Sequence, residues 1–211
     1  MSVVVSPFAA DLAQMAHEAG QLILRHYAGN TIVRTKRDES PVTAADEEAE
    51  ALIESALAKL APGVPVIAEE AVAKGRVPKL ARTFFLVDPL DGTKEFLKKN
   101  GEFTVNIGLI EDGRTVCGVV LAPAKGRTFI GEKGKGAYEV PSRENAALDF
   151  AAARPIRARA VPAEGLVALV SRTHRDSKTE DYLAAIADTR PTLTDAMLAE
   201  FEADIEQCTR L

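Results

Sequence analysis

Hydrophobic residues recur at helical spacing in two segments near the N-terminus. Between residues 8 and 27 they repeat every three to four positions, after Ser6 and Pro7, a residue pair typical of a helix start. A second apolar stripe at 49–60 follows the sequence TAAD at 43–46, which has the spacing of a capping box with Asp in place of Glu. The pattern predicts two amphipathic helices, the first ending near Gly29.

Runs of β-forming residues dominate the middle of the chain. Short apolar runs at 64–68 and 84–87 predict two buried strands. Residues 103–110 and 115–121 predict a hairpin, because an Asp-Gly turn lies between them. The remaining predicted elements are a short strand at 32–35, strands at 127–131, 137–140 and 166–170, and helices at 177–187 and 192–211.

A loop-like stretch rich in Ala and Arg at 142–162 indicates a junction within the chain. We therefore expect one domain with two lobes, an α+β lobe at 1–140 and a shorter α/β lobe at 141–211. A chain of 211 residues is long enough to bury a substantial core in this way.

The predicted strand at 84–87 is followed at once by the sequence DPLDGT. Asp88 and Asp91 place two carboxylates three residues apart in a turn, where the Leu90 carbonyl can point to the same place. Such hard oxygen atoms suit a divalent metal. The amides of Gly92 and Thr93 would open a short helix and favour a phosphate group. The pattern indicates phosphoryl chemistry, although an ordinary Asp-rich turn has the same composition.

Three other carboxylates are candidates for the same site. Asp46 lies in the first turn of the second predicted helix, where the helix dipole alone favours a carboxylate. Glu69 and Glu70 follow a predicted strand directly, and either complete a metal cluster or form a solvated pair. His17 and His26 fall on or near the polar side of the first helix, so we expect both to be solvated.

Composition excludes several classes of function. The net charge is −5, Trp is absent and aromatic residues make up 5% of the chain, which disfavours binding to a nucleic acid polymer. An acidic protein that binds an anionic substrate needs added positive charge, which metal ions supply. Cys117 and Cys208 are too far apart for a recognisable disulfide or zinc pattern, and Cys117 suits a core. We expect no signal peptide or transmembrane segment, and a cytoplasmic protein, with peripheral binding at the inner membrane face as the alternative.

Four segments in order resemble the inositol monophosphatase superfamily, and in particular its 3′(2′),5′-bisphosphate nucleotidase branch. They are KRDESPVTAAD at 36–46, the Glu69-Glu70 pair, DPLDGTKEFLKKNGEFTVNIGLI at 88–110 and SRTH at 171–174. The resemblance covers about residues 8–185. It implies a layered α-β-α-β-α sugar-phosphatase-type fold.

The resemblance also implies roles for individual residues. Mg²⁺ would be held by three carboxylates and one carbonyl, those of Glu69, Asp88, Asp91 and Leu90. The phosphorylated substrate would contact the same segment and a later loop, at Glu69, Leu90, Asp91, Gly92, Thr93, Ser171 and His174. Asp46 and Thr93 would together orient and deprotonate the attacking water.

The reaction implied by the resemblance is hydrolysis of adenosine 3′,5′-bisphosphate to AMP and phosphate, a step of sulfur metabolism. Inositol monophosphate and fructose bisphosphate are the alternative substrates. The expected partner is a small phosphorylated molecule, and the sequence leaves the oligomeric state open.

The C-terminal part departs from the family pattern. Family members carry a Trp-Asp signature and a Gly-Gly turn after the last matching segment, whereas this chain has no Trp and no Gly after Gly165. We therefore expect an altered or shortened second lobe. A metal-binding remnant with impaired catalysis is the alternative to an active enzyme.

Overall fold

The computed structural model describes residues 5–29, 33–35, 41–79, 81–158 and 160, together with residues 177, 178, 180, 181 and 184. The chain divides into two compact units, residues 1–157 and 158–211. All elements named below belong to the first unit. In the second, the described positions between 177 and 184 are helical and lie within the predicted helix at 177–187.

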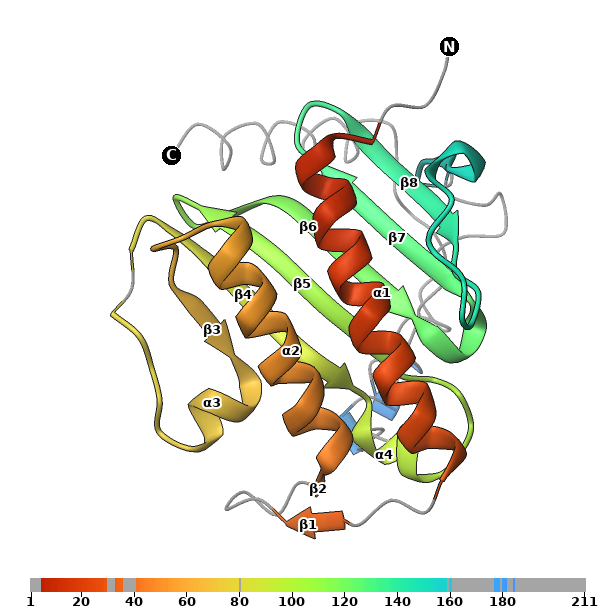
Figure 1. Cartoon of the computed structure of the whole chain (residues 1–211). Coiled ribbons are helices and arrows are strands. Elements are labelled where there is room, and N and C mark those ends of the chain that lie inside the picture. The colour runs from red at the N-terminus through yellow and green to blue at the C-terminus, as the bar shows by residue number, and fades with distance from the viewer. Residues whose placement is uncertain are drawn as a thin grey trace. The chain divides into compact units, whose positions relative to one another are not determined.

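A seven-stranded sheet forms the centre of the first unit (Figure 1). Its strands, in sheet order, are β3 (Val66–Ala68), β4 (Thr83–Asp91), β5 (Thr104–Glu111), β6 (Arg114–Ala122), β7 (Arg127–Glu132), β8 (Gly136–Pro141) and β9 (Arg154–Ile156). β3 runs parallel to β4, and the other neighbouring pairs are antiparallel. The predicted hairpin is confirmed, and its turn has the left-handed backbone at Asp112 and Gly113 that an Asp-Gly pair adopts readily.

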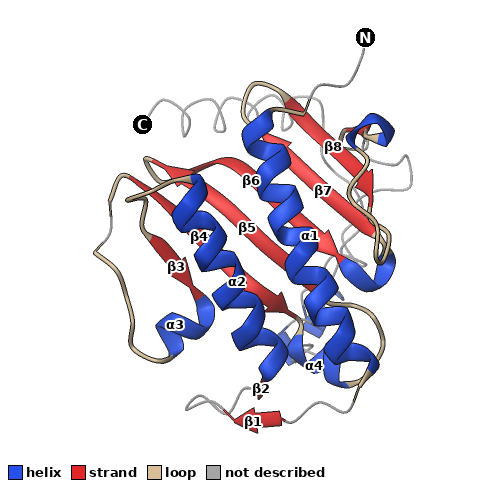
Figure 2. Cartoon of the chain, in the orientation of Figure 1, coloured by secondary structure: helices blue, strands red, loops and turns tan. Residues whose placement is uncertain are grey.

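Two long helices, α1 (Pro7–Ala28) and α2 (Ala44–Leu60), lie side by side on one face of this sheet (Figure 2). The shorter elements are α3 (Glu69–Ala73), α4 (Thr93–Leu97), the 3₁₀ turns η1 (Pro123–Lys125) and η2 (Phe150–Ala152), and the two-stranded sheet of β1 (Val33–Thr35) and β2 (Pro41–Thr43). The helix layer on a mixed sheet confirms the predicted layered fold. The division into lobes at 1–140 and 141–211 stays a prediction.

Both long helices begin as the sequence predicts. The Ser6 hydroxyl accepts a hydrogen bond from the Ala9 amide at 3.2 Å. Thr43 and Asp46 form a complete capping box, in which the side chain of each residue accepts a hydrogen bond from a backbone amide at the opposite end of the turn. Because the caps satisfy amides that the helices themselves leave unpaired, they fix where α1 and α2 start.

The core lies between the helix layer and the sheet. α1 contributes Leu12 and Ile23, α2 contributes Ile53, and the sheet contributes Phe85 and Ile107, all nearly inaccessible to solvent. These positions are those of the predicted apolar stripes and strands. Cys117 is also buried, as predicted, and burial raises the pKa of its thiol to about 11.

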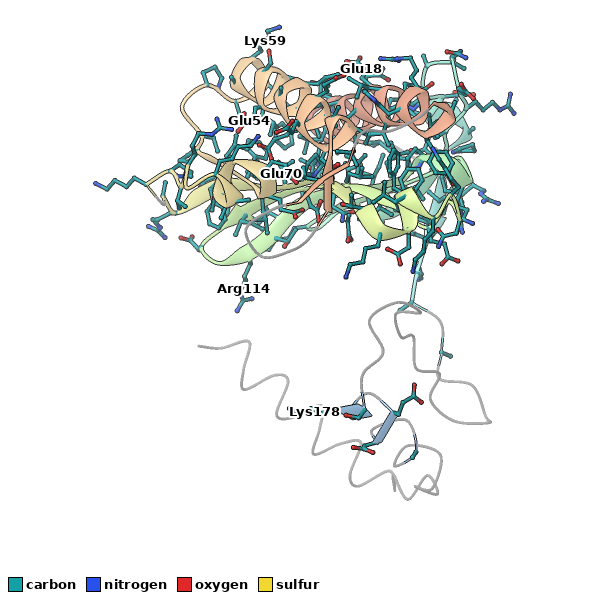
Figure 3. The ribbon with its side chains drawn as sticks, turned by 90° about the horizontal axis from the view of Figure 1, so that it is seen from below. Glu18, Glu54, Lys59, Glu70, Arg114 and Lys178 are labelled. Carbon is teal, nitrogen blue, oxygen red and sulfur yellow. The ribbon has the colours of Figure 1, made fainter. Side chains whose placement is uncertain are left out.

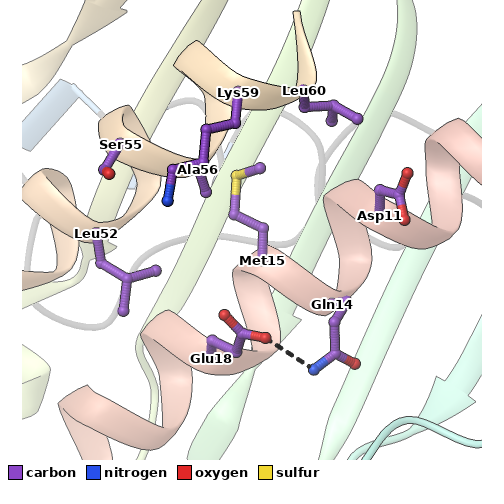
Figure 4. Close-up of a pocket in the computed structure, with 9 residues that line it drawn as sticks. All are labelled: Asp11, Gln14, Met15, Glu18, Leu52, Ser55, Ala56, Lys59 and Leu60. Carbon is purple, nitrogen blue, oxygen red and sulfur yellow. Dashed lines mark hydrogen bonds between the residues drawn. The ribbon is translucent and has the colours of Figure 1, made fainter.

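A groove runs between α1 and α2, and Figure 4 shows its lining. It is lined by Asp11, Gln14, Met15, Glu18, Leu52, Ser55, Ala56, Lys59 and Leu60. None of the predicted site residues lines it, so the candidate site must be sought at the ends of the strands.

Two strand predictions need correction. β4 does not stop at Asp88 but continues to Asp91, because β5 pairs with both residues across a register irregularity. The stretch at 142–162 is not entirely loop, since it contains β9. β9 is a short edge strand with Pro155 at its centre, and such a strand carries little hydrophobic signal.

The prediction for His17 is wrong. Its side chain is only 3% exposed, with Nδ1 lying 2.9 Å from the Ser142 hydroxyl and Nε2 lying 2.7 Å from the Ala146 carbonyl. It therefore joins α1 to the segment after β8. His26 Nε2 instead lies 3.0 Å from a carboxylate oxygen of Glu48, and both of these side chains are partly exposed.

Replacing His17 by alanine is expected to lower the free energy of unfolding by about 2 kcal/mol, because the buried ring and its two hydrogen bonds are lost and the buried Ser142 hydroxyl keeps no partner on α1. His26→Ala, on the same helix, is the matched control, and its effect should stay within about 0.5 kcal/mol. Urea denaturation of both variants gives the comparison. Equal losses of stability in the two variants would contradict the role of His17 as a buried link between α1 and the segment after β8.

In the described part of the chain, no helix combines the length and apolar character needed to span a bilayer. The predicted strand at 166–170 and the predicted helix at 192–211 lie outside the described residues. The same holds for Ser171 and His174.

Candidate metal and phosphate site

The pairing of β3 with β4 brings two predicted ligands together. The two strands are parallel, and Ala68 lies opposite Val87, so Glu69, the first residue after β3, lies beside Asp88 on β4. Their carboxyl groups are in hydrogen-bonding contact. Burial first, and then the negative charges of Glu69 and Asp91, raise the pKa of Asp88 to about 8. The strand ends therefore bring carboxyl groups close enough together for each negative charge to disfavour the next.

The irregular end of β4 sets the direction of the two aspartates. The Leu90 amide donates to Asp88 Oδ1 at 3.2 Å, which folds the carboxylate back over its own turn. Asn106 lies opposite Asp88 on β5, and its Nδ2 donates to Asp91 Oδ2 at 3.1 Å. The Leu90 side chain is buried, which anchors the turn in the core. β4 and β5 together therefore hold the acidic turn.

Gly92 turns the chain from β4 into α4. Its φ is +90°, in the left-handed region, and a Cβ built there would lie 2.9 Å from the Glu102 carbonyl oxygen and 3.3 Å from Phe103 Cα. A residue with a side chain would meet both the strained backbone and the collision. The sequence can therefore make this sharp turn only with glycine.

Asp46 reaches the same turn from the start of α2. Its Oδ1 accepts a hydrogen bond from the Thr93 hydroxyl at 3.1 Å, and the same hydroxyl lies 3.2 Å from the Leu90 carbonyl. Its Oδ2 accepts from the Thr43 amide at 2.8 Å and the Thr43 hydroxyl at 2.6 Å. Asp46 thus caps a helix and orients Thr93 at the same time.

The environment of Asp46 raises the proton affinity of its carboxylate. The residue is 1% exposed, and burial is the main cause that raises the pKa of its carboxyl group above the ordinary value. Hydrogen bonds from Thr43 and Thr93 oppose this rise. A carboxylate with a raised pKa, held against a hydroxyl, is suited to receive a proton.

A cluster of three aromatic side chains fixes α4 in the fold. The rings of Tyr27, Phe96 and Phe103 pack with centroid distances between 5.0 and 5.4 Å. The Lys99 ammonium group contacts the Tyr27 ring and donates to the Tyr27 carbonyl. α4 is only one turn long, so these contacts rather than its own length fix the position of Thr93.

Oxygen donors of the kind that Mg²⁺ prefers are therefore gathered at this edge. Even so, in the ranges that the structure describes, no three His, Cys, Asp or Glu side chains meet closely enough to form a metal-ligand group by themselves. Glu69, Asp88 and Asp91 are close enough to repel one another but do not form a closed ligand shell. The donor set fits the metal in kind, and its mutual repulsion is what a cation would relieve.

The structure thus brings Asp46, Glu69, Asp88, Leu90, Asp91, Gly92 and Thr93 into one connected turn region. The sequence left open that Glu69 and Glu70 form a solvated pair. This alternative is wrong for Glu70, which is 2% exposed. The sequence reasoning missed Asn106 and Thr43. Asn106 lies in a predicted strand, but no local sequence pattern indicates that it pairs with Asp88. Thr43 was identified as a cap without its contact to the site.

Comparisons with known proteins show the family to which the chain belongs. A model of the inositol monophosphatase family matches residues 5–202, which extends the likeness beyond the segment at 8–185 that the motifs cover. The 3′(2′),5′-bisphosphate nucleotidases CysQ of Shigella flexneri and of Escherichia coli K12 are each 38% identical over 183 residues. That match covers 86% of this chain and 70% of theirs.

Solved structures agree as well. CysQ of Bacteroides thetaiotaomicron, described as a bacterial member of the inositol monophosphatase family, matches with a TM-score of 0.63 and 33% identity, covering 84% of this chain and 67% of that one. The suhB protein of Bartonella henselae matches with a TM-score of 0.55 and 33% identity, covering 63% of this chain and 52% of that one. Family model, relatives and fold agree with the resemblance in the sequence, and the chain belongs to the inositol monophosphatase family.

Proposed function

We propose that the chain is a Mg²⁺-dependent phosphomonoesterase that hydrolyses adenosine 3′,5′-bisphosphate to AMP and phosphate. The observation that carries the proposal is the contact of Asp46 with Thr93 beside the acidic ends of β3 and β4. The CysQ relatives, named as 3′(2′),5′-bisphosphate nucleotidases, support this substrate. The chain spans about 70% of the length of these relatives, so the activity of the whole protein is part of the proposal.

The metal would be held by the carboxylates of Glu69, Asp88 and Asp91 and by the Leu90 carbonyl. When bound, Mg²⁺ supplies the positive charge that balances the phosphate and lowers the pKa of water. Asn106 keeps the Asp91 carboxylate facing this region through its 3.1 Å hydrogen bond. Glu69 and Asp91 are exposed, so solvent and substrate reach the site directly.

Asp46 and Thr93 act on the attacking water. The Thr93 hydroxyl donates its proton toward Asp46, which leaves an oxygen lone pair free to accept a proton from water. As water attacks phosphorus, its proton passes to Thr93 Oγ1 and the Thr93 proton passes to Asp46 Oδ1. The raised pKa of Asp46 makes it a better acceptor than an exposed aspartate. The 3′ oxygen leaves with the bonding electron pair and takes a proton from solvent.

The substrate phosphate is proposed to lie against the amides of Gly92 and Thr93. Gly92 lets the backbone turn sharply here, and a bare backbone allows a phosphate to approach closely. Ser171 and His174 are proposed to contact the nucleoside, on the strength of the family resemblance alone. The coarser conclusion, a small phosphorylated molecule as substrate, does not depend on these two residues.

Phosphate release from adenosine 3′,5′-bisphosphate, with and without Mg²⁺, tests the proposal. We expect Mg²⁺-dependent turnover, with kcat/KM in the usual range of about 10⁴–10⁸ M⁻¹s⁻¹. Inositol monophosphate and fructose bisphosphate, assayed in parallel, should be hydrolysed at least about tenfold less efficiently, which corresponds to about 1.4 kcal/mol of discrimination. A folded chain that binds metal without turnover of any of the three would establish the alternative, a catalytically impaired member of the family.

A further inference from the structure

We propose that Glu50 is a positioning residue for Glu69: it fixes the start of α3 and thereby directs the Glu69 carboxylate toward the metal site. The inference rests on the proposed function, because it concerns one of the proposed metal ligands. It assigns a role to a buried acidic side chain that neither the sequence motifs nor the reaction chemistry uses.

Glu50 lies on α2 one helical turn after Asp46, so the two carboxylates leave the same face of the helix. Its side chain is 3% exposed. The Glu70 amide donates to Glu50 Oε2 at 2.7 Å, a short, charge-assisted hydrogen bond in a buried place. Figure 3 shows Glu70 between the helix layer and the sheet, whereas Glu18 and Lys59 project from the outer side of the helices.

α3 needs this bond because it has no cap of its own. The residue before it is Ala68, whose side chain offers no acceptor, and no side-chain cap is formed there. The first amides of any helix lack partners within the helix, and α3 has only five residues to hold its shape. Glu50 supplies the missing acceptor from a neighbouring helix, and a carboxylate is favoured at a helix N-terminus.

The segment after α3 folds back onto the same carboxylate. The Arg76 amide donates to the Ala71 carbonyl at 2.8 Å, and Arg76 Nη2 lies 3.8 Å from Glu50 Oε1. A buried carboxylate is costly unless it is both hydrogen-bonded and near a positive charge. Glu50 has both, one on each oxygen. Glu50 therefore bonds the start of α3 and lies near a positive charge from the segment that follows α3.

The backbone at Glu69 is consequently fixed on two sides. Ala68 before it pairs with Val87 in the sheet, and the Glu70 amide after it is bound by Glu50. The backbone position of Glu69 is therefore set between these points, and its carboxyl group contacts Asp88. α2 thus sets both halves of the site, Thr93 through Asp46 and Glu69 through Glu50.

The experiment measures metal binding directly, with Mn²⁺ as a paramagnetic probe detected by electron paramagnetic resonance, on the whole chain. Glu50→Leu removes the acceptor and the charge, whereas Glu50→Gln removes the charge but keeps an oxygen that can accept from the Glu70 amide. Glu47→Gln is the matched control, because Glu47 also lies on α2 and pairs at an exposed position with Lys74, the residue directly after α3, at 2.8 Å.

We expect Glu50→Leu to weaken Mn²⁺ binding by about 10-fold or more, the usual effect of losing a residue that orients a metal ligand. Glu50→Gln should weaken it by less than about threefold, and Glu47→Gln should leave it unchanged. At saturating Mg²⁺, Glu50→Leu should recover most of its kcat, because the ligand is misplaced and not removed. Should the leucine variant not fold, Glu50→Ala carries the same expectation.

Equal losses in Glu50→Leu and Glu50→Gln would assign the effect to charge and overturn the positioning role. Unchanged binding in Glu50→Leu or Glu50→Ala would overturn it as well, even if the phosphatase activity is found. Reduced binding in a chain that hydrolyses none of the substrates would support the positioning role and contradict the proposed function. A wild-type chain that binds no Mn²⁺ would overturn both.

Discussion

Replacing Asp46 by asparagine is expected to lower the rate of phosphate release by about 10²–10⁴-fold, the contribution of a positioned general base. The asparagine carbonyl can still accept from the Thr43 amide and hydroxyl, so the cap of α2 survives. Its NH₂ group then faces Thr93. The Thr93 hydroxyl must accept this hydrogen bond and turn its own proton toward the Leu90 carbonyl, 3.2 Å away. Because no base is left to receive the Thr93 proton, Thr93 cannot take a proton from water.

The same substitution is expected to leave the fold at least as stable above neutral pH. Burial raises the pKa of Asp46, so the folded state binds its proton more tightly than the unfolded state does. The wild type therefore loses stability as the pH rises through the raised pKa, whereas asparagine does not titrate. The advantage of Asp46→Asn should be largest at high pH and should vanish below about pH 4, where aspartate is protonated in both states.

Initial rates of phosphate release test the expected loss of activity, and denaturation midpoints at several pH values test the expected pH dependence of stability. Thr43→Val is the control, since it removes the two hydrogen bonds of the Thr43 hydroxyl, with the Ala45 amide and with Asp46, and none with Thr93. It should cost about 1 kcal/mol of stability and retain most of the activity. Activity losses that simply follow stability losses in both variants would contradict a role for Asp46 in the reaction.

The helix starts were predictable because their signals are local. The capping box of Thr43 and Asp46 spans four residues, and Ser6 with Pro7 marks α1 in the same way. The Asp-Gly hairpin turn is equally local. Where a backbone preference lies within a few neighbouring residues, the sequence alone reveals it.

The arrangement of the site was predictable only through resemblance. Asp46 and Thr93 are 47 positions apart, and no pattern of hydrophobicity relates them. Asn106 reaches Asp91 because of a register between strands that side-chain alternation does not determine at an irregular strand end. The prediction that His17 is solvated is wrong for a similar reason. Its partners, Ser142 and Ala146, come from the segment after β8, more than 120 positions along the chain.

The role of Glu50 could not be predicted from the sequence for the same reason. On sequence it is one of several glutamates in a helix with many charges, and its spacing suits solvent exposure as well as burial. Only the packing of α2 against α3 and β3 makes it a buried acceptor for the Glu70 amide. Long-range packing, which propensities do not report, decides which of several like residues acquires a role.

Replacing Gly92 by alanine is expected to lower the free energy of unfolding by at least about 2 kcal/mol, because a left-handed backbone alone costs a residue with a Cβ about 1–2 kcal/mol. The added methyl group would also lie 2.9 Å from the Glu102 carbonyl oxygen, so the backbone must shift. That shift moves α4, and with it Thr93, away from Asp46. A displacement of about 1 Å at a reacting group can cost about 10²-fold in rate.

Gly63→Ala is the matched control for this variant. Gly63 has a φ of +84°, close to the +90° of Gly92, but a Cβ built there meets no atom within 4 Å. It should therefore show the backbone cost of about 1–2 kcal/mol without a loss of activity. The difference between the two variants isolates the close approach of the turn to Glu102 and Phe103. If both variants lost the same stability and both kept their activity, the tight turn at Gly92 could not be what holds Thr93 against Asp46.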